Sequence, residues 1–367
     1  MKTPLSQPDN HSIVSMPWTR VASFAVTATL VLTAAASRGQ DRPGNSYTRT
    51  DLVSDIPGKA AHTDPNLVNP WGLTLGNEFW VSNNGTGTST LYDLEGDPLP
   101  LVVTIPPSAS NSEGISAPTG QVFNPGSNFV VTNGTASGPA IFIFVSEDGG
   151  ISGWNPTVDV NNAILAVDHG AEGSIYKGFA ISDGLDRLYA TDFHNAKVEM
   201  YDANFNEIDN ETTFVDPNLP AGYAPFGIQS INGSIYVTYA LQDADRTDDV
   251  PGPGHGFVSV FDTNGNFIKR LISRQPLNSP WGLALAPASG FGKASGKLLV
   301  GNFGNGRINS FDLDSGVYRG FLRKENGSVL AVSGLWALLF VDTDLYVTGG
   351  IGGEAHGVFS EITANHP

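Results

Sequence analysis

A short glycine-centred motif recurs six times in this 367-residue chain, at intervals of roughly 50 residues. Self-similarity with such a period is typical of repeat folds, in which each unit packs against its neighbours. The motif therefore restricts the chain to a solenoid or to a closed ring of units. Its copies are PWGL (70–73), PTGQ (118–121), YKGF (176–179), PFGI (225–228), PWGL (280–283) and, with alanine replacing glycine, LWAL (335–338).

A second motif follows each copy and has the form of a β-strand. It comprises FWVSN (79–83), FVVTN (129–133), LYATD (188–192), IYVTY (235–239), LLVGN (298–302) and LYVTG (345–349). In four units an aromatic-Asp pair then ends a third strand, and another β-rich run follows. Four short strands per unit, turns rich in Gly, Asn and Pro, and no helical periodicity predict an all-β six-bladed β-propeller over residues 47–367.

The last unit is one strand short of the others. Its third strand is expected at residues 357–362, and a β-rich segment at residues 47–53 is left over before the first unit. We expect this N-terminal strand to pair with the last blade and close the ring, because closure leaves only short sheet edges. Removal of residues 47–53 should then open the ring.

The N-terminal segment has the pattern of a secretory signal. Lys2 and Arg20 precede an uncharged run at residues 21–36, which ends in the small residues Ala34 and Ala36. We interpret residues 1–36 as a cleaved signal peptide and residues 37–46 as a linker, which predicts a secreted or periplasmic protein. The alternative is a membrane anchor, but the run is short for a ~20-residue span. After cleavage we expect a monomer with no membrane attachment.

Charge and cysteine content exclude several classes of function. The chain has 19 Lys and Arg against 36 Asp and Glu, for a net charge of −17, and it has no cysteine. An acidic chain without clustered basic residues does not favour nucleic acid as a partner. Without cysteine, thiolate catalysis and Cys-ligated metal sites are excluded.

The predicted ring places two sets of loops around one mouth of its central channel. These loops enter the first strand of each blade or follow its second strand, so their residues form a candidate ligand-binding face. Packing between blades is the favoured interpretation of the tryptophans, and turn formation is the favoured interpretation of each asparagine taken singly. The residues of this face are Trp71, Trp281, Trp336, Asn83, Asn84, Asn133, Asn302 and Asn305.

A long acidic loop at residues 241–256 is expected at the same mouth. Long loops on a rigid scaffold are often functional, although a solvated acidic loop is the simpler interpretation. Asp192, His194 and His255 are the candidate acid–base residues. The candidate ligands for Ca²⁺ or another divalent metal such as Zn²⁺ are Asp192, Asp243, Asp245 and His255.

Several of these stretches resemble a family of exported bacterial β-propeller proteins of uncharacterised function, some of which carry PEP-CTERM sorting signals. They are residues 69–73 (NPWGL), 82–93 (SNNGTGTSTLYD), 151–156 (ISGWNP), 176–180 (YKGFA), 239–258 (YALQDADRTDDVPGPGHGFV) and 279–283 (SPWGL). The resemblance implies a propeller and an exported location, and it implies no activity. More distantly, the repeats look like NHL-repeat and gluconolactonase-type propellers. The inner-strand positions here do not reproduce the metal ligands of those lactonases.

Two functions remain open from the sequence. The first is a non-catalytic module that binds an extracytoplasmic ligand, polymer or protein on the aromatic, Asn-rich face. The alternative is a metal-dependent hydrolase or lyase, in which the metal lowers the pKa of a bound water. The absence of any acid–base pair of recognisable spacing favours the first.

Overall fold

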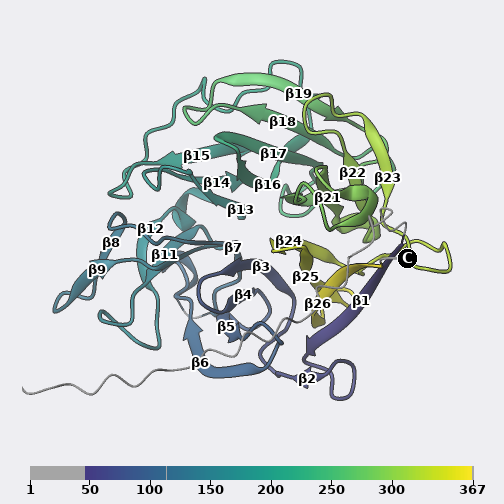
Figure 1. Ribbon diagram of the computed structural model, residues 1–367. Helices are drawn as coiled ribbons and strands as arrows, with labels where there is room; N and C mark the ends of the chain where they lie inside the picture. The colour runs from purple at the N-terminus through teal and green to yellow at the C-terminus, as the bar shows by residue number, and fades with distance from the viewer. Residues whose placement is uncertain (1–45, 113, 366–367) are drawn as a thin grey trace, which may run out of the picture. The chain divides into compact units, whose positions relative to one another are not determined.

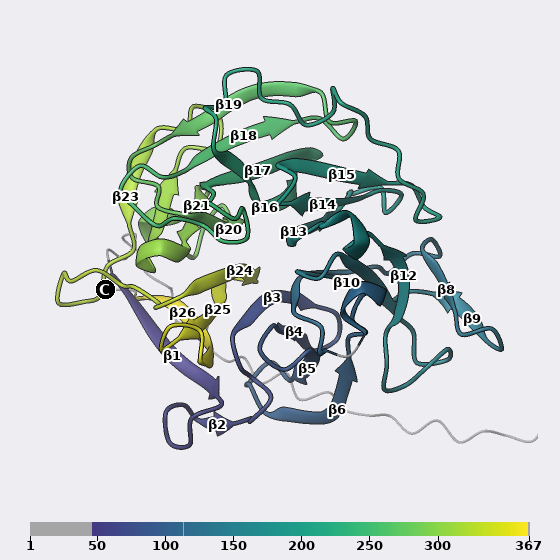
Figure 2. The same ribbon diagram turned by 180° about the vertical axis from the view of Figure 1, so that it is seen from behind.

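The computed structural model describes residues 46–112 and 114–365, and these belong to one compact unit. Six β-sheets surround a central axis as the blades of a propeller (Figure 1), and the view from behind shows the same ring (Figure 2). Helix among the described residues is limited to four short 3-10 turns: η1 (Ala109–Asn111), η2 (Gly170–Glu172), η3 (Gly292–Ala294) and η4 (Phe303–Asn305). None of these is long enough to cross a membrane. The predicted all-β six-bladed propeller is confirmed. The predicted signal peptide (1–36) and almost all of the linker (37–46) lie outside the described residues.

In each blade the repeat strands pair antiparallel, and the first of them faces the axis. Blade 1 consists of β3 (Pro70–Leu75), β4 (Phe79–Asn83), β5 (Thr88–Tyr92) and β6 (Pro98–Thr104). Blade 2 consists of β7 (Pro118–Phe123), β10 (Phe142–Ser146), β11 (Gly150–Trp154) and β12 (Ile164–Asp168). Blade 3 consists of β13 (Tyr176–Ile181), β14 (Leu188–Asp192) and β15 (Lys197–Tyr201). Blade 4 consists of β16 (Tyr223–Ile231), β17 (Ser234–Leu241), β18 (Phe257–Phe261) and β19 (Phe267–Ser273). Blade 5 consists of β20 (Pro280–Leu285), β21 (Leu298–Asn302), β22 (Ile308–Phe311) and β23 (Tyr318–Phe321).

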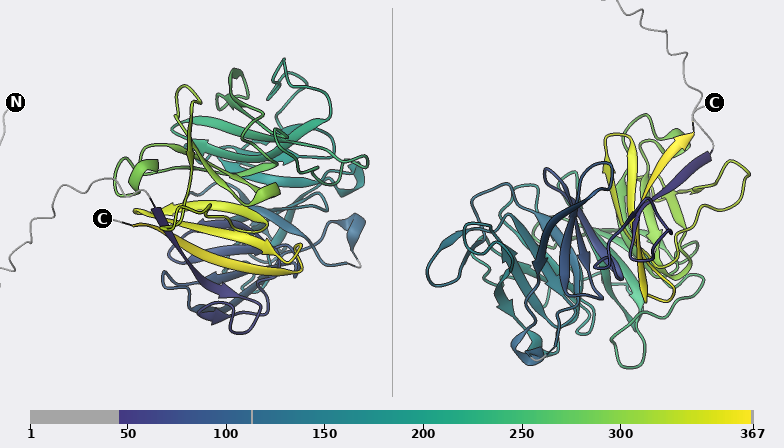
Figure 3. Two further views of the ribbon diagram at one scale, coloured as in Figure 1. Left: turned by 90° about the vertical axis from the view of Figure 1, so that its right-hand side faces the viewer. Right: turned by 90° about the horizontal axis from the view of Figure 1, so that it is seen from below.

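The N-terminal strand closes the ring, as predicted. Blade 6 contains β24 (Leu335–Val341), β25 (Asp344–Ile351), β26 (His356–Asn365) and β1 (Ser46–Ser54), and β2 (His62–Thr63) extends the sheet. The pairing of β1 with β26 is antiparallel and runs from Ser46 opposite Asn365 to Ser54 opposite Val358. Side views show β1 along the outer edge of β26 (Figure 3).

The recurring glycine is required by the contact between neighbouring inner strands. A Cβ atom on Gly227 of β16 would overlap the carbonyl oxygen of Trp281 on β20, and one on Gly282 would overlap the carbonyl oxygen of Trp336 on β24. Threonines of the second motif bridge blades at the same level. The Thr191 hydroxyl donates to the carbonyl oxygen of Phe226 at 2.8 Å, and the Thr348 hydroxyl of the last blade donates to that of Trp71 in the first at 2.7 Å. Both sequence motifs are therefore contacts of ring assembly.

Two blades differ from the prediction. In blade 2 the second strand is β10, not residues 129–133, which contribute to a separate hairpin of β8 (Val130–Thr132) and β9 (Ser137–Pro139). Residues 129–133 have the residue pattern of the second motif, but two of the three residues of β8 are exposed. All five residues of β10 are buried, and β10 is the strand that pairs with β7. Blade 3 has three strands in its described sheet rather than four.

Candidate functional site at the channel mouth

Each inner strand contributes one side chain at an equivalent level of the channel. The level follows from strand pairing, because one residue near the start of each inner strand lies opposite a residue at or near the end of the second strand; these residues are Pro70, Pro118, Tyr176, Pro225, Pro280 and Leu335. The next residue along each inner strand is buried in all six blades. These residues are Trp71, Thr119, Lys177, Phe226, Trp281 and Trp336.

The three tryptophans of this ring fill the channel by packing on one another. The rings of Trp71 and Trp336 are stacked with centroids 3.4 Å apart, and Trp281 meets each of them edge-on. Phe303 stacks on the other side of Trp336, with centroids 4.1 Å apart. The exposed fraction of the tryptophans is 8% or less. The three tryptophans therefore act in packing, and none presents a free ring face on which a ligand could stack.

Lys177 is the charged member of the ring. Its ammonium lies 5.4 Å from the ring centroid of Trp71 and 5.8 Å from that of Phe193. It forms ion pairs with the carboxylate of Glu147 and, at 3.1 Å, with that of Asp248. Burial by itself would lower the pKa of Lys177, but the two carboxylates outweigh burial and the pKa lies above its ordinary value. Lys177 is therefore a fixed cation and not a nucleophilic amine.

Glu147 and Glu354 bring carboxylates from blades 2 and 6 to this cation. Glu147 follows β10, and its Oε2 accepts a hydrogen bond from Asn84 Nδ2 at 2.8 Å. Glu354 lies in the turn between β25 and β26 with a φ of 68°, a left-handed conformation that is uncommon for a residue other than glycine. Its Oε2 accepts from Asn69 Nδ2 at 2.8 Å. Asn69 also bonds Asn84 Oδ1, and its own Oδ1 accepts from the Trp336 indole at 3.1 Å.

The long loop between β17 and β18 adds two further carboxylates from blade 4. Asp248 reaches Lys177 while its side chain stays 74% exposed. Asp249 is more buried, and its Oδ2 makes no hydrogen bond. Burial raises the pKa of Asp249 to about 6, although the Lys177 ammonium acts in the opposite direction. Burial also raises the pKa of Glu354, helped by the charges of Glu147 and Asp248. Perturbed carboxylates around one cation mark a candidate functional site.

The arrangement, which we call the mouth cluster, combines acceptors and donors. It consists of Lys177, Glu147, Asp248, Asp249 and Glu354 with Asn69 and Asn84. Five of the six blades contribute to it. Its carboxylates outnumber its ammonium, so the mouth is negative at neutral pH. Such a surface binds groups that donate hydrogen bonds, while the half-buried Asn84 amide, which has one N–H in use, can also donate.

The predicted acid–base residues are not gathered at one point. Asp192 is buried and holds its own turn, accepting from the backbone of Ile175 at 3.1 Å and from Asn195 Nδ2 at 2.7 Å. The ring of His194 lies beside Gly173. His255 forms a hydrogen bond through Nδ1 to the carbonyl oxygen of Val250, five residues earlier in its own loop.

The predicted metal ligands are also used locally. Asp243 accepts hydrogen bonds from the backbone and hydroxyl of Thr247, and Asp245 is exposed. Across residues 46–112 and 114–365, no group of three or more His, Asp or Glu side chains is placed to hold a metal ion. The structure therefore does not bring Asp192, Asp243, Asp245 and His255 together as a Ca²⁺ or Zn²⁺ site.

Of the predicted asparagines, only Asn84 belongs to the mouth cluster. Asn83 is buried and donates to Thr90 Oγ1 at 2.9 Å, and Asn302 donates to the carbonyl oxygen of Pro276 at 3.0 Å. Asn305 accepts from the backbone of Arg307 beside η4. Asn133 forms the tip of the β8–β9 hairpin, where it accepts from the backbone of two following residues, so it is not at the mouth. These hydrogen bonds place the four at turns and strand ends, and the Oδ1 atoms of Asn83 and Asn302 are buried without a hydrogen-bond partner.

Glu147 and Glu354 were missed by the sequence reasoning, for different reasons. Glu147 follows β10, the second strand of blade 2. The sequence pattern had assigned that strand to residues 129–133 instead. The buried FIFVS stretch at 142–146 is the signal that would have located it. Glu354 follows two glycines in a turn, and nothing in a turn of that composition distinguishes a functional carboxylate from a solvated one.

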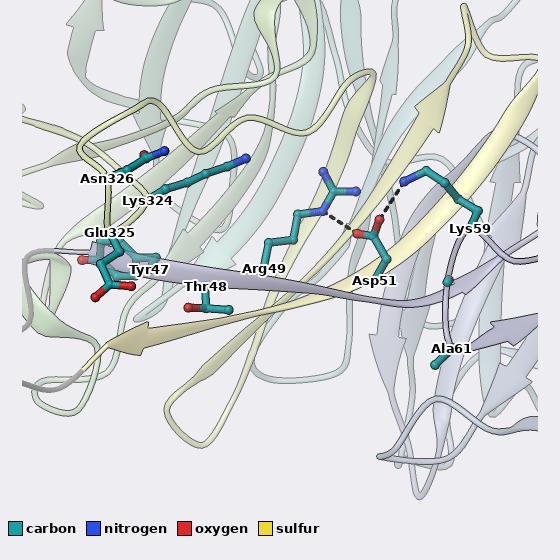
Figure 4. A pocket seen from close by; sticks show the side chains of 10 residues that line it. Tyr47, Thr48, Arg49, Asp51, Lys59, Ala61, Lys324, Glu325 and Asn326 are labelled. Atoms are coloured by element: carbon teal, nitrogen blue, oxygen red, sulfur yellow. Dashed lines mark hydrogen bonds and ion pairs between the residues drawn. The ribbon is translucent and has the colours of Figure 1, made fainter.

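A separate cavity lies on the rim, where the ring is closed. It has a volume of about 930 Å³ and lies between β1, residues 59–61 and the turn at residues 324–326 (Figure 4). Asp51 forms ion pairs there with Arg49 at 2.7 Å and Lys59 at 2.9 Å. Asp51 also accepts from the Ser360 hydroxyl of β26. These contacts hold the closing strand in place, so we assign this region to ring closure.

Comparison with known proteins identifies sequence relatives and distant structural neighbours. No protein-family model matches the chain. The uncharacterized protein R648 of Acanthamoeba polyphaga mimivirus is 36% identical over 337 residues, covering 88% of this chain and 82% of that protein. The expected bacterial and PEP-CTERM relationship has no support in this relative, which is viral, and stays a prediction.

The solved structures that resemble this chain agree on its fold. A glucose dehydrogenase gives a TM-score of 0.55 at 13% identity, covering 87% of this chain and all of that chain. A catalytically inactive virginiamycin B lyase from Staphylococcus aureus, with quinupristin, gives 0.52 at 13% identity and covers 87% of this chain and 99% of that chain. At this identity the likeness concerns the propeller fold alone.

Proposed function

We propose that this chain, which belongs to the same protein family as the uncharacterized mimivirus protein R648, is a ligand-binding β-propeller whose mouth cluster recognises a polyhydroxylated molecule such as a glycan. The observation that carries the proposal is the buried ammonium of Lys177 among carboxylates from several blades. Sugar hydroxyls donate and accept hydrogen bonds. A site that presents carboxylate acceptors beside the Asn84 amide donor matches that chemistry.

The polar groups of the mouth are fixed before any ligand arrives. Glu147 is held by Lys177 and Asn84, and Glu354 is held by Asn69, which the Trp336 indole holds in turn. A site with few rotamers to lose binds at a lower entropic cost. This arrangement supports binding more than it supports a reaction that requires moving groups.

A simple organic or inorganic cation fits the mouth cluster less well. Lys177 already occupies the centre of the carboxylates, so a second cation would meet its repulsion. The metal-dependent hydrolase or lyase that the sequence left open stays a prediction, with a ligand set still to be identified. The exported location predicted from residues 1–36 also stays a proposal, and it would expose the mouth to extracellular polymers.

The test is binding of a panel of soluble oligosaccharides by titration calorimetry at pH 7, with chelator present. We expect at least one glycan to bind, and Glu147→Gln and Asp248→Asn each to weaken it about tenfold, since each removes a charged acceptor. Asp245→Asn, an exposed position in the same loop, is the matched control and should not change affinity.

Three outcomes would contradict the proposal. They are no glycan binding, equal binding by wild type and Glu147→Gln, or a signal that appears only after a divalent metal replaces the chelator. The third would favour the hydrolase or lyase alternative.

A further inference from the structure

The cavity on the rim adjoins the outer edge of β1. Its volume of about 930 Å³ lies between β1, residues 59–61 and the turn at residues 324–326 (Figure 4). The residues of β1 that line it fall between Tyr47 and Asp51. Pairing with β26 closes the ring through the other edge of the strand. The cavity therefore lies beside the edge of β1 that ring closure does not use.

Hydrogen bonds at the two ends of this edge show which way its backbone groups point. The N–H of Tyr47 donates to the carbonyl oxygen of Arg323 at 2.8 Å. The carbonyl oxygen of Asp51 accepts from the N–H of Ala61 at 3.3 Å. Tyr47 and Asp51 thus direct their backbone groups away from β26. In an antiparallel pair alternate residues point to the same side, so Arg49 does the same.

Four backbone groups on this edge have no hydrogen-bond partner within residues 46–112 and 114–365. They are the carbonyl oxygen of Tyr47, the N–H and the carbonyl oxygen of Arg49, and the N–H of Asp51. Arg49 and Asp51 line the cavity and remain partly exposed, so a ligand can reach them. Two donors and two acceptors in a row on a sheet edge form a template for a further strand.

The gap in pairing is short and has fixed ends. Arg323 and Ala61 occupy the position of a neighbouring strand at either end. Tyr47 and Asp51 are four residues apart, which corresponds to about 13 Å along a strand. An added strand therefore has room for about three residues, and a longer chain would have to turn away from β1 at both ends.

Cationic side chains surround the gap. Figure 4 shows the Lys324 ammonium directed toward the Arg49 guanidinium, whereas the Glu325 carboxylate points away from both. The Asp51 carboxylate faces the cations, but it is already paired with Arg49 at 2.7 Å and with Lys59 at 2.9 Å. The Lys324 ammonium has no ion-pair partner in the described part of the chain. Three cations therefore face one carboxylate, in a chain whose net charge is −17.

We propose that the outer edge of β1 binds a short extended peptide segment with an acidic side chain at its centre. The segment would lie antiparallel to β1, and its central residue would exchange two backbone hydrogen bonds with Arg49. Residues that are directly opposite in a sheet project from the same face. The acidic side chain would then lie beside the Arg49 guanidinium, within the attraction of the Lys324 ammonium.

A second copy of this chain is a less favourable occupant. Pairing of two β1 edges about a twofold axis at Arg49 would place this arginine opposite its equivalent and bring the Lys324 ammonium of each copy to the same region. Like charges directly opposite each other destabilise a sheet. The edge shares no residue with the mouth cluster, so the peptide proposal does not depend on the glycan proposal.

The experiment titrates the full protein with the blocked tripeptide acetyl-Val-Glu-Val-amide by calorimetry at pH 7 and low salt. We expect saturable binding below about 1 mM, at least about fivefold tighter than that of acetyl-Val-Lys-Val-amide. The same glutamate peptide N-methylated at its central residue cannot donate to the Arg49 carbonyl oxygen. It should bind about tenfold more weakly.

Amide hydrogen exchange gives a second readout, which attraction between charges alone would not change. The Arg49 N–H should exchange more slowly when the glutamate peptide is bound. The Thr50 N–H, which faces β26, is the internal reference and should not change.

A lysine variant and two control variants test the charge. Lys324→Gln should weaken the glutamate peptide about threefold. The matched control is Arg246→Gln, which removes one positive charge from the loop between β17 and β18, outside the cavity, and should leave affinity unchanged. Glu147→Gln should also leave affinity unchanged, which separates this edge from the mouth cluster.

Four outcomes would overturn the proposal. They are equal affinity for the lysine peptide, equal affinity for the N-methylated peptide, unchanged exchange of the Arg49 N–H in the bound state, or no binding at millimolar peptide. The last would assign the cations to protection of the sheet edge against association.

Discussion

Two buried charges in this propeller are stabilised in different surroundings. Glu199, on β15 of blade 3, accepts hydrogen bonds from the hydroxyls of Tyr176 and Tyr201 and pairs with the Lys197 ammonium at 2.9 Å. His169 Nδ1 lies 3.3 Å from the same carboxylate. Burial would raise the pKa of Glu199, but the two tyrosine hydroxyls and the Lys197 ammonium together hold it below its ordinary value. We call these five residues the Glu199 cluster.

The mouth cluster differs in where its partners come from. The partners of Glu199 lie on blade 3 or in the segment that leads into blade 3, and the Glu199 carboxylate is fully buried. Those of Lys177 come from blades 2 and 4, and their side chains are 25% and 74% exposed. A buried charge is therefore not by itself the mark of a site. The mouth cluster differs from the Glu199 cluster because its partners come from several blades and still reach solvent. We take this combination to distinguish a binding site from a buried group that only stabilises the fold.

Glu199→Leu should give the largest effect. It leaves the Lys197 ammonium and two tyrosine hydroxyls without their acceptor, so we expect a loss of about 3–4 kcal/mol of unfolding free energy, measured by urea denaturation. Glycan binding at the mouth should be unchanged in the folded fraction. Glu207→Gln, a more exposed partner of Lys197, is the control. A loss below about 1 kcal/mol would mean that the Glu199 cluster contributes no more to the unfolding free energy than the mouth cluster does, which would contradict the comparison.

Asp249→Asn tests the opposite case, a buried carboxylate that destabilises. Because the native pKa of about 6 lies above the ordinary value of 3.8, the native state binds more protons than the unfolded state between these pH values. Folding stability should therefore fall as pH rises through that window. At pH 8 the variant should be about 3 kcal/mol more stable than wild type, and at pH 3 equal to it. Thermal unfolding at both pH values would show this, and a pH-independent difference would refute it.

Lys177→Met should cost less stability than loss of Glu199. Its partners Glu147 and Asp248 can turn to water, so we expect a loss of about 1 kcal/mol in urea denaturation. Binding at the mouth should fall about tenfold or more. The comparison fails if the variant loses as much stability as Glu199→Leu while keeping its affinity.

His169→Gln should give the smallest effect. Glu199 retains both tyrosines and Lys197, so a loss of about 0.5 kcal/mol is expected in the same assay. A larger loss would show that His169 is a principal partner of the carboxylate.

The sequence predicted the propeller because its signals are contacts between neighbouring units. Gly227 and Gly282 are required where inner strands meet, and Thr191 and Thr348 bridge adjacent blades. Such contacts recur with the repeat, so they can be counted without coordinates. The error in blade 2 has the same origin. Residues 129–133, which include the first strand of the separate β8–β9 hairpin, have the residue pattern of a second strand, and the pattern alone contains no information on pairing.

The site was less predictable, because its members do not repeat. The sequence by itself determined six blades, closure by the N-terminal strand, and a long acidic loop near the channel. Only the tertiary structure decided that Asp248 and Asp249, rather than Asp243 and Asp245, face the buried Lys177, and that Glu147 and Glu354 join them. The physical reason is that each blade contributes one or two side chains. Which of them meet depends on how five separate loops turn over the mouth, and no local pattern specifies that.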